Sequence, residues 1–248
     1  MSRILIVVVF LLLPLHSIFA GATATHWSYE GEEGPEHWGD LSPDYHFCKE
    51  GMNQSPVDLV ADVHADLPEL VFQYHGTPLH ETNNGHTIMV NVQPGSFLEV
   101  PDQNLRFGLV QGHFHSPSEH TVDGEHYAME IHLVHSRHDG GLLVVGIMVE
   151  EGEEDPMLNR IWSFMPENVG DSTESPLTVF EAGVLPPTTN YFAYSGSLTT
   201  PPCTEGVRWI VLREPLTASA EQIARFKEKV GPVTNRPIQD HNARLILD

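Results

Sequence analysis

Two short histidine-rich stretches of this sequence could build a metal centre. Residues 112–115 read Gly-His-Phe-His, and residues 130–135 read Glu-Ile-His-Leu-Val-His. In an extended chain, side chains at i and i+2 lie on the same face, so His113 and His115 point the same way. A neighbouring antiparallel strand can bring His132 opposite them, because cross-strand Cβ atoms lie roughly 5 Å apart. Three converging imidazoles suit zinc and leave a fourth position open for water, as in catalytic zinc sites.

The residues that precede these histidines could support them as ligands. The chain has 16 histidines, so a His-x-His pair on a solvated strand could also arise by chance. However, Gln111 lies two residues before His113, and Glu130 lies two residues before His132. Metal-bound histidines usually donate their second ring N–H to an amide, a carboxylate or a carbonyl. The pairing therefore favours a metal site over a chance pattern.

Five ordered motifs resemble those of the α-class carbonic anhydrases. They are Asn53–Pro56 (NQSP), Asn83–His86 (NNGH), Gln111–His120 (QGHFHSPSEH), Glu130–His135 (EIHLVH) and Ser195–Pro202 (SGSLTTPP). The resemblance runs from about Trp27 to Arg236. Within the family, the sequence most resembles the bacterial secreted or periplasmic branch. The chain departs from the pattern at Met89, where relatives tend to carry Asn or Gln. This departure bears on the water network of the cavity and on inhibitor preference.

The resemblance implies an enzyme that hydrates carbon dioxide reversibly to bicarbonate and a proton. Its cofactor would be Zn²⁺ on His113, His115 and His132. Zinc acidifies its bound water to a pKa of about 7 in carbonic anhydrase itself, the standard example of this effect. Zinc-hydroxide would then attack the substrate, and hydrolysis of activated esters is an expected side reaction. Sulfonamides and anions are expected inhibitors by the same resemblance.

The resemblance also assigns catalytic roles to three residues. An ionised Glu119 can only accept a hydrogen bond. It would take the hydroxyl proton of Thr199, whose oxygen would then accept from the zinc-bound hydroxide and orient it. Without the zinc motifs, the Thr-Thr-Pro-Pro run would indicate only a rigid turn. His86 matches the proton shuttle of the family, and an ordinary pKa near 6.5 suits it to that task. His120 and His135 are expected to be structural.

Carbon dioxide is apolar, so its docking surface should be small and apolar. Val134 shares the face of His132 by i+2 spacing and should project into the cavity. By resemblance the substrate site also includes Val144, Leu198, Thr199, Thr200, Val207 and Trp209. For Val207 and Trp209, an ordinary place in the core is an equal alternative. The resemblance places Tyr29, Asn84 and Met89 along the water path of the proton.

The N-terminus has the pattern of a secretory signal peptide. Arg3 precedes an apolar stretch over residues 4–15, and small residues follow at 20–22. A membrane span needs about 20 apolar residues, more than this stretch offers. We therefore expect residues 1–22 to be a signal peptide and residues 23–248 to be one catalytic domain. The protein would be exported, periplasmic or secreted, without membrane attachment after cleavage.

The charge balance bears on which partners the protein can bind, and the two cysteines bear on the redox state of its compartment. Acidic residues outnumber Lys and Arg 34 to 12, so nucleic acid would be repelled. The resemblance leaves room for a homodimer, because dimers are common among bacterial relatives. Cys48 and Cys203 are the only cysteines. In an oxidising compartment they can form one intramolecular disulfide, and two free thiols are the alternative.

Strand patterns dominate the elements that must position these residues. Apolar, β-branched and aromatic residues concentrate at 87–92, 97–100, 105–115, 127–135, 142–150 and 207–213. Asp155-Pro156 predicts a helix start that runs to about Met165, and Ser219 with Gln222 predicts a capping box for a helix over 220–229. The fold class is mainly β (α+β), with one domain. By resemblance, its centre is a twisted, mostly antiparallel sheet of about ten strands with short peripheral helices.

Two other classes of function compete with an enzyme. The first is a catalytically silent binding protein on the same fold; such relatives typically lack a zinc histidine, whereas all three are present here. The second is a periplasmic zinc reservoir, which the number of histidines suggests. The remaining histidines are scattered rather than gathered in a tract, which argues against a reservoir.

Overall fold

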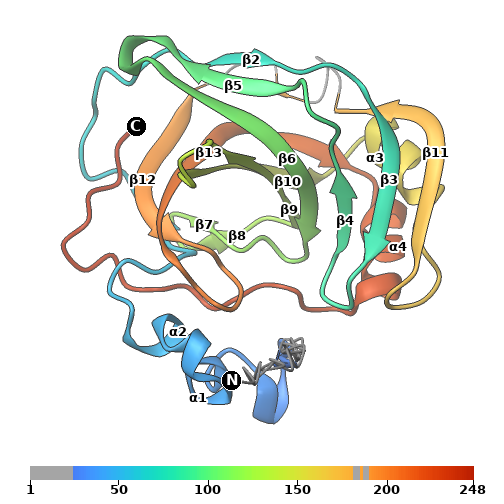
Figure 1. Cartoon of the computed structure of the whole chain (residues 1–248), viewed down its shortest axis with the longest axis horizontal. Coiled ribbons are helices and arrows are strands. Elements are labelled where there is room, and N and C mark those ends of the chain that lie inside the picture. The colour runs from blue at the N-terminus through green and yellow to red at the C-terminus, as the bar shows by residue number, and fades with distance from the viewer. Residues whose placement is uncertain (1–24, 181–184, 187–189) are drawn as a thin grey trace, which may run out of the picture.

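The computed structural model describes residues 25–180, 185–186 and 190–248, and the expected signal peptide lies outside the described residues. Its centre is a sheet of ten strands that curves strongly round the molecule (Figure 1). Eight strands follow one another in the order β11 (Ser172–Val179), β3 (Thr77–Asn83), β4 (Ile88–Asn91), β6 (Leu105–His115), β9 (Met129–Ser136), β10 (Leu142–Glu151), β13 (Glu205–Ala218) and β12 (Tyr191–Ser197). Strand β5 (Phe97–Val100) pairs with β6, and β2 (Val71–Gln73) pairs with β5.

The described strands of this sheet are antiparallel except at one place. Strands β10 and β13 run parallel, and every other pair in the sheet is antiparallel. A smaller sheet contains β1 (Asp58–Leu59), β7 (Thr121–Val122) and β8 (Glu125–His126). The predicted fold class, with a mostly antiparallel sheet of about ten strands, is confirmed.

The strands that the sequence pattern missed lie mainly at the ends of the sheet. Edge strand β11 contains Pro176 at a register shift between Ser175 and Thr178, a position where proline is tolerated. At the other end, β12 contains Gly196, where a Cβ atom would lie 2.1 Å from the Ser55 hydroxyl oxygen. Proline and glycine weaken a strand pattern, so neither segment was predicted.

Both predicted helices are present. Helix α3 (Pro156–Trp162) is capped by Asp155, whose side chain accepts from the Leu158 N–H at 2.7 Å. It ends three residues before the predicted limit, because Pro166 disfavours helical backbone in the residue before it. Helix α4 (Ala220–Val230) has the predicted capping box of Ser219 and Gln222. Both helices lie on the side of the molecule where β11 lies in Figure 1, and α3 contacts both α4 and β11. Within the described residues, no helix is long and apolar enough to cross a membrane.

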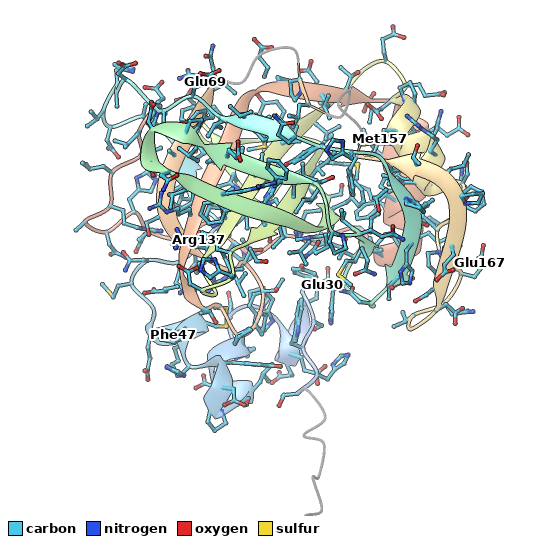
Figure 2. All side chains as sticks on the ribbon, turned by 45° about the horizontal axis from the view of Figure 1, so that its top comes forward. Glu30, Phe47, Glu69, Arg137, Met157 and Glu167 are labelled. Atoms are coloured by element: carbon cyan, nitrogen blue, oxygen red, sulfur yellow. A yellow bond between two sulfur atoms is a disulfide. The ribbon has the colours of Figure 1, made fainter. Side chains whose placement is uncertain are left out.

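The N-terminal part of the described chain forms short helical turns that the sequence pattern did not predict. They are η1 (Gly31–Glu33), α1 (Trp38–Leu41), η2 (Pro43–Tyr45) and α2 (Phe47–Glu50), and a further turn, η3 (Pro101–Gln103), follows β5. The N-terminal turns lie below the sheet in Figures 1 and 2, and Figure 2 labels Phe47 and Glu30 there. Trp38 is fully buried there and anchors the segment to the domain.

Buried side chains alternate between the two faces of the sheet and form two separate hydrophobic clusters. In β13, Ile210 and Leu212 belong to a large cluster with Trp162 of α3 and Phe226 of α4. Val207, Trp209 and Val211 belong to a smaller cluster on the opposite face of β13. Because successive strand residues point to opposite faces, one face of the sheet packs on the helices and the other remains for the functional site.

A buried carboxyl group on β3 has no charged partner in the described structure. Glu81 is fully buried, its Oε1 has no hydrogen-bond partner, and its Oε2 lies 3.4 Å from the Thr173 hydroxyl. That hydroxyl already donates to the Phe164 carbonyl. Burial raises the pKa of Glu81 to about 8, an effect that the Thr173 contact only partly offsets. Glu81 is therefore mostly protonated at neutral pH.

Glu81→Gln is expected to change how stability depends on pH. The folded-state pKa lies above the unfolded value, so the folded protein binds the extra proton, and its stability falls as pH rises from about 4.5 to about 8. The contribution approaches about 1.4 kcal/mol per pH unit within that window. Gln cannot ionise, so urea unfolding at pH 5, 7 and 9 should show a flatter profile for the variant. Equal slopes for the variant and the parent would show that Glu81 does not titrate in this window.

Candidate active site

Strands β6 and β9 bring three histidines together. His113 pairs directly with His132 across these strands, and His115 follows two residues later on β6. One nitrogen from each of the three rings lies within 4.8 Å of the other two. The ring centroids are 4.6 to 5.1 Å apart. The convergence expected from the i+2 spacing is therefore present on one face of the sheet.

Hydrogen bonds on the far side of each ring decide which nitrogen faces the centre. His113 Nδ1 donates to Gln111 Oε1 at 2.8 Å, and His115 Nδ1 donates to the Thr234 carbonyl at 2.5 Å. His132 Nε2 donates to Glu130 Oε1 at 2.8 Å. The remaining nitrogens are Nε2 of His113 and His115 and Nδ1 of His132, each with its lone pair free for a metal.

The centre has the properties of a metal site that keeps an open position. His115 Nε2 and Glu119 Oε2 are buried without hydrogen-bond partners within the described structure. Oε2 lies 3.5 Å from His115 Nε2 and 3.8 Å from His132 Nδ1. A cation would take the lone pair of His115 Nε2 and would be attracted by the Glu119 carboxylate, and three imidazole nitrogens are the donor set of catalytic zinc. The residues present therefore fit a zinc ion.

The charge state of the rings also suits a cation. Burial, together with repulsion between the rings, lowers the pKa of His113 and His115, so both are neutral ligands at neutral pH. Burial acts in the same direction on His132, but the carboxylates of Glu130 and Glu119 outweigh it and raise the pKa of that ring. A metal at Nδ1 would balance these carboxylates in place of a proton.

Glu130 fixes several groups around His132. Its Oε1 accepts from His132 Nε2 and from His120 Nδ1, both at 2.8 Å. Its Oε2 accepts from the backbone N–H groups of Glu119 and His120 at 2.9 and 2.8 Å. Gly146 pairs with His132 on β10, and a Cβ atom there would lie 2.8 Å from Glu130 Oε1. His120 thus has the structural role expected from the sequence.

The NQSP and SGSL motifs meet behind this carboxylate. His120 Nε2 accepts from the Tyr194 hydroxyl at 2.7 Å, and that hydroxyl lies 2.8 Å from Ser55 Oγ. Ser55 and Ser197 exchange hydrogen bonds between backbone N–H groups and side-chain oxygens, at 2.9 and 3.1 Å. A continuous chain of hydrogen bonds therefore connects two motifs that are distant in sequence to His132.

Glu119 and Thr199, expected to orient the nucleophile, are both buried. Glu119 Oε1 accepts from the Arg236 N–H at 2.9 Å. Among the described residues, no hydrogen bond joins Thr199 to Glu119, and Glu119 Oε2 keeps its accepting capacity free. Thr200 lies in the same loop, where its carbonyl accepts from the Cys203 N–H at 2.9 Å. The orienting role of Thr199 thus stays a prediction.

The expected apolar wall lies beside the triad. Val134 pairs with Val144 on β10, and Val144 pairs with Trp209 on β13, which places these three residues in one row across the sheet. The Trp209 ring meets the His132 ring edge-on, with centroids 4.9 Å apart. Val207 is buried and Leu198 partly buried in the same cluster. The row places apolar side chains beside His132, and Val144 and Trp209 are buried there.

His86 stands on the turn between β3 and β4. The Oδ1 atom of Asn84 accepts from the N–H groups of His86 and Thr87, both at 2.9 Å, so Asn84 shapes the turn itself. Gly85 has φ +87°, which glycine adopts without strain. The His86 ring is half-buried and stacks on Trp27, with centroids 3.6 Å apart and planes 8° apart.

Two other residues expected on the water path lie nearby. Tyr29 meets the His86 ring edge-on, with centroids 6.4 Å apart. Burial and the Glu119 carboxylate raise the pKa of the Tyr29 phenol well above its ordinary value, so it remains protonated. Met89 pairs directly with His113 across β4 and β6, which places an apolar side chain next to one of the three histidines.

Sequence reasoning missed two residues of the C-terminal segment. Thr234 contributes its backbone carbonyl to His115, and Arg236 contributes its backbone N–H to Glu119. The guanidinium of Arg236 is buried and donates to Gln54 Oε1 and to the carbonyls of Ser55 and Cys48. Backbone groups leave no signal in residue type, so only the fold reveals these contacts.

The predicted disulfide is present. Cys48 and Cys203 are bonded, with an S–S distance of 2.11 Å, and they are separated by 155 residues. The Cys203 carbonyl also accepts from Gln54 Nε2 at 3.1 Å. The bridge joins the N-terminal turns to the loop that contains Thr199 and Thr200, and the alternative of two free thiols is wrong.

The chain forms a mainly β domain with three histidines gathered on one face of the sheet, and known proteins are similar to it in sequence and fold. A profile of the eukaryotic-type carbonic anhydrases matches residues 33–247. A carbonic anhydrase of Nostoc is 46% identical over 235 residues, which cover 92% of this chain and 88% of that protein. One of Pectobacterium carotovorum is 43% identical over 234 residues, covering 93% and 95%.

A solved structure agrees with these relatives. The α-carbonic anhydrase of Thermovibrio ammonificans, in complex with the inhibitor sulfanilamide, superposes with a TM-score of 0.87 at 44% identity, covering 91% of this chain and 100% of that one. The chain belongs to the eukaryotic-type, or α-class, carbonic anhydrase family. It is accordingly an enzyme of carbon dioxide hydration.

Gln111→Ala is expected to weaken zinc binding by about 10–100-fold without loss of the fold. The substitution removes the acceptor of His113 Nδ1–H and leaves that ring free to turn. Zinc titration against a chelating indicator measures the change. Gln103→Ala is the control, because the exposed Gln103 contacts Arg208. Equal affinity of the Gln111 variant and the parent would show that this hydrogen bond does not support the site.

Proposed function

We propose that this protein hydrates carbon dioxide with a zinc ion held by His113, His115 and His132, and that His86 carries the released proton outward. The observation that carries this proposal is the convergence of three ring nitrogens, with His115 Nε2 and Glu119 Oε2 unsatisfied beside them. Enzymes of this family use zinc. When bound, zinc would supply an acidified water and hence a nucleophile at neutral pH.

The residues around the ion would position the reactants. Glu119 would accept the Thr199 hydroxyl proton at its free Oε2, so that the Thr199 oxygen can only accept in turn. The row of Val134, Val144 and Trp209 would hold carbon dioxide, which has no group that calls for a strong hydrogen bond. Leu198, Thr200 and Val207 would complete the site beside this row.

The proton must leave the site after each turnover. His86 is half-buried near the site, and its pKa is lowered by burial and by His26, so the ring gives up a proton readily. Tyr29 stays protonated and can hold water between the metal centre and His86. Met89 adds an apolar side chain beside His113 and would exclude water from that side of the path.

Three further proposals concern the setting of the enzyme. Residues 1–22 would direct export to the periplasm or the medium, which agrees with the Cys48–Cys203 disulfide. Sulfonamides and small anions would bind at the open metal position. A side activity on activated esters would use the same nucleophile.

Metal exchange tests the proposal. Protein stripped of zinc by a chelator should lose carbon dioxide hydration in a stopped-flow indicator assay, and one equivalent of Zn²⁺ should restore it. Sulfanilamide should inhibit the restored enzyme. A stripped protein with undiminished activity would overturn the assignment of zinc, and an inactive zinc-loaded protein would favour a binding protein on this fold.

His86→Ala is expected to lower kcat in weak buffer and to leave kcat/KM nearly unchanged, because only proton removal is slowed. Added imidazole should restore kcat, since it replaces the missing side chain as proton acceptor. Stopped-flow measurements at rising imidazole concentration check this outcome. Absence of rescue would show that the proton leaves by another route.

A further inference from the structure

A second histidine stands outside the proposed proton shuttle. His26 lies on the N-terminal segment, and its ring centroid is 6.3 Å from that of His86, with the ring planes at 46°. Its side chain is 73% exposed, whereas His86 is half-buried against Trp27. One water molecule with two hydrogen bonds spans roughly 5–6 Å. The two rings are therefore placed for proton transfer across a single water.

Glu33 fixes the tautomer of this outer histidine. His26 Nδ1 lies 3.0 Å from Glu33 Oε2. A carboxylate can only accept a hydrogen bond, so Nδ1 carries the hydrogen and Nε2 keeps its lone pair. His26 can then accept a proton at Nε2 and release it from the same atom to solvent.

The segment that holds this pair is well anchored. Trp38 Nε1 donates to the carbonyls of Ser28 and Glu33, at 2.8 and 3.0 Å. The Ser28 N–H donates to the Glu33 carbonyl at 2.9 Å, and the Tyr45 hydroxyl donates to the Thr25 carbonyl at 2.8 Å. His26 and Glu33 thus keep their positions relative to each other although their side chains are exposed.

The local electrostatics favour outward movement of the proton. Burial, and then repulsion from His26, lowers the pKa of His86. Four exposed carboxylates, Glu30, Glu32, Glu33 and Glu36, follow His26 within ten residues of the sequence, and Glu30 lies where the N-terminal segment approaches the sheet in Figure 2. A group of negative charges at the surface attracts protons and cationic buffers.

We propose that His26, oriented by Glu33, is the outer station of the proton path. The proton leaves the His86 imidazolium, crosses one water and binds His26 Nε2, and buffer then removes it from the exposed ring. His86 returns to its neutral form, and no other bond changes. This inference rests on the proposed function, because it extends the path that begins at the metal centre.

His26→Ala tests the outer station, with His37→Ala as the matched control. His37 is an exposed histidine of the same segment. In weak buffer, kcat of His26→Ala should fall several-fold while kcat/KM stays at the parent value, and imidazole should restore kcat. Glu33→Ala should also lower kcat, because without this carboxylate the hydrogen of the neutral His26 ring is no longer held on Nδ1. The control should match the parent at every buffer concentration.

A titration independent of activity completes the test. In zinc-free protein, the NMR signals of the His86 ring should report a higher pKa in His26→Ala than in the parent, because the repulsion from His26 is gone. His37→Ala should show no such shift. Either parent-like kcat of His26→Ala in weak buffer or an unshifted His86 titration would overturn the outer station. If His86→Ala still showed imidazole rescue, the proposed function would stand.

Discussion

His132→Ala is expected to lose zinc and carbon dioxide hydration together. The ring would supply one of the three nitrogens proposed to bind zinc. Its removal should weaken zinc binding by more than the 10–100-fold that is typical, to about an order of magnitude, of losing a hydrogen-bond partner of a ligand. The fold should survive, because Glu130 would still accept from His120 Nδ1 and from two backbone N–H groups. Metal analysis after dialysis, the stopped-flow assay and thermal unfolding measure the three quantities.

Thr199→Ala separates the loss of metal from the loss of chemistry. Thr199 is not among the three ligands, so this variant should keep one zinc per chain and still lose most of its activity. Glu119→Gln should behave similarly, because an amide can donate where the carboxylate only accepts. Full metal occupancy and parent activity in His132→Ala would contradict the ligand assignment. Parent activity in both Thr199→Ala and Glu119→Gln would contradict the orienting role alone.

The double variant Cys48→Ala/Cys203→Ala is expected to lose roughly 5 kcal/mol of unfolding free energy. The bridge closes a loop of 155 residues, and the chain-entropy model gives this value for that length. Urea unfolding of the variant, and of the parent with and without reductant, measures the difference. Coincident unfolding curves would show that the disulfide does not stabilise the fold.

The same variant should also lose activity before it unfolds globally. The Cys203 N–H donates to the Thr200 carbonyl, and the Cys48 carbonyl accepts from Arg236, whose N–H holds Glu119. Loss of the bridge therefore loosens the Thr199 loop and the Glu119 support together. Activity measured along the urea titration should decline at lower urea concentration than tryptophan fluorescence.

The inner strands were predictable because their apolar pattern is continuous. Strands β5 and β6 have the predicted bounds, and β9 and β10 differ from the prediction by two residues or fewer. Strand β13 runs to Ala218, beyond the predicted end at Arg213, because it passes Pro215 at a register irregularity against β10. Such an irregularity depends on the neighbouring strand, so the local sequence does not indicate it.

The candidate site, like the fold, could be predicted from the sequence only in part. Side-chain spacing predicted the convergence of His113, His115 and His132, since i+2 periodicity fixes which residues share a face. The contribution of Thr234 is a backbone carbonyl, and that of Arg236 includes a backbone N–H, so neither has a signature in residue type. The stacking of His86 on Trp27 likewise depends on how the N-terminal segment folds back.

We propose that His113, His115 and His132 hold a zinc ion and that carbon dioxide is hydrated there. Exchange of ¹⁸O between labelled carbon dioxide and water tests it most directly, because the exchange proceeds by repeated hydration and dehydration, and a catalyst of these steps accelerates it. The zinc-loaded protein should deplete the label far faster than buffer alone, and His132→Ala should deplete it at the uncatalysed rate. Depletion by the zinc-loaded parent at the rate of buffer alone would contradict the claim.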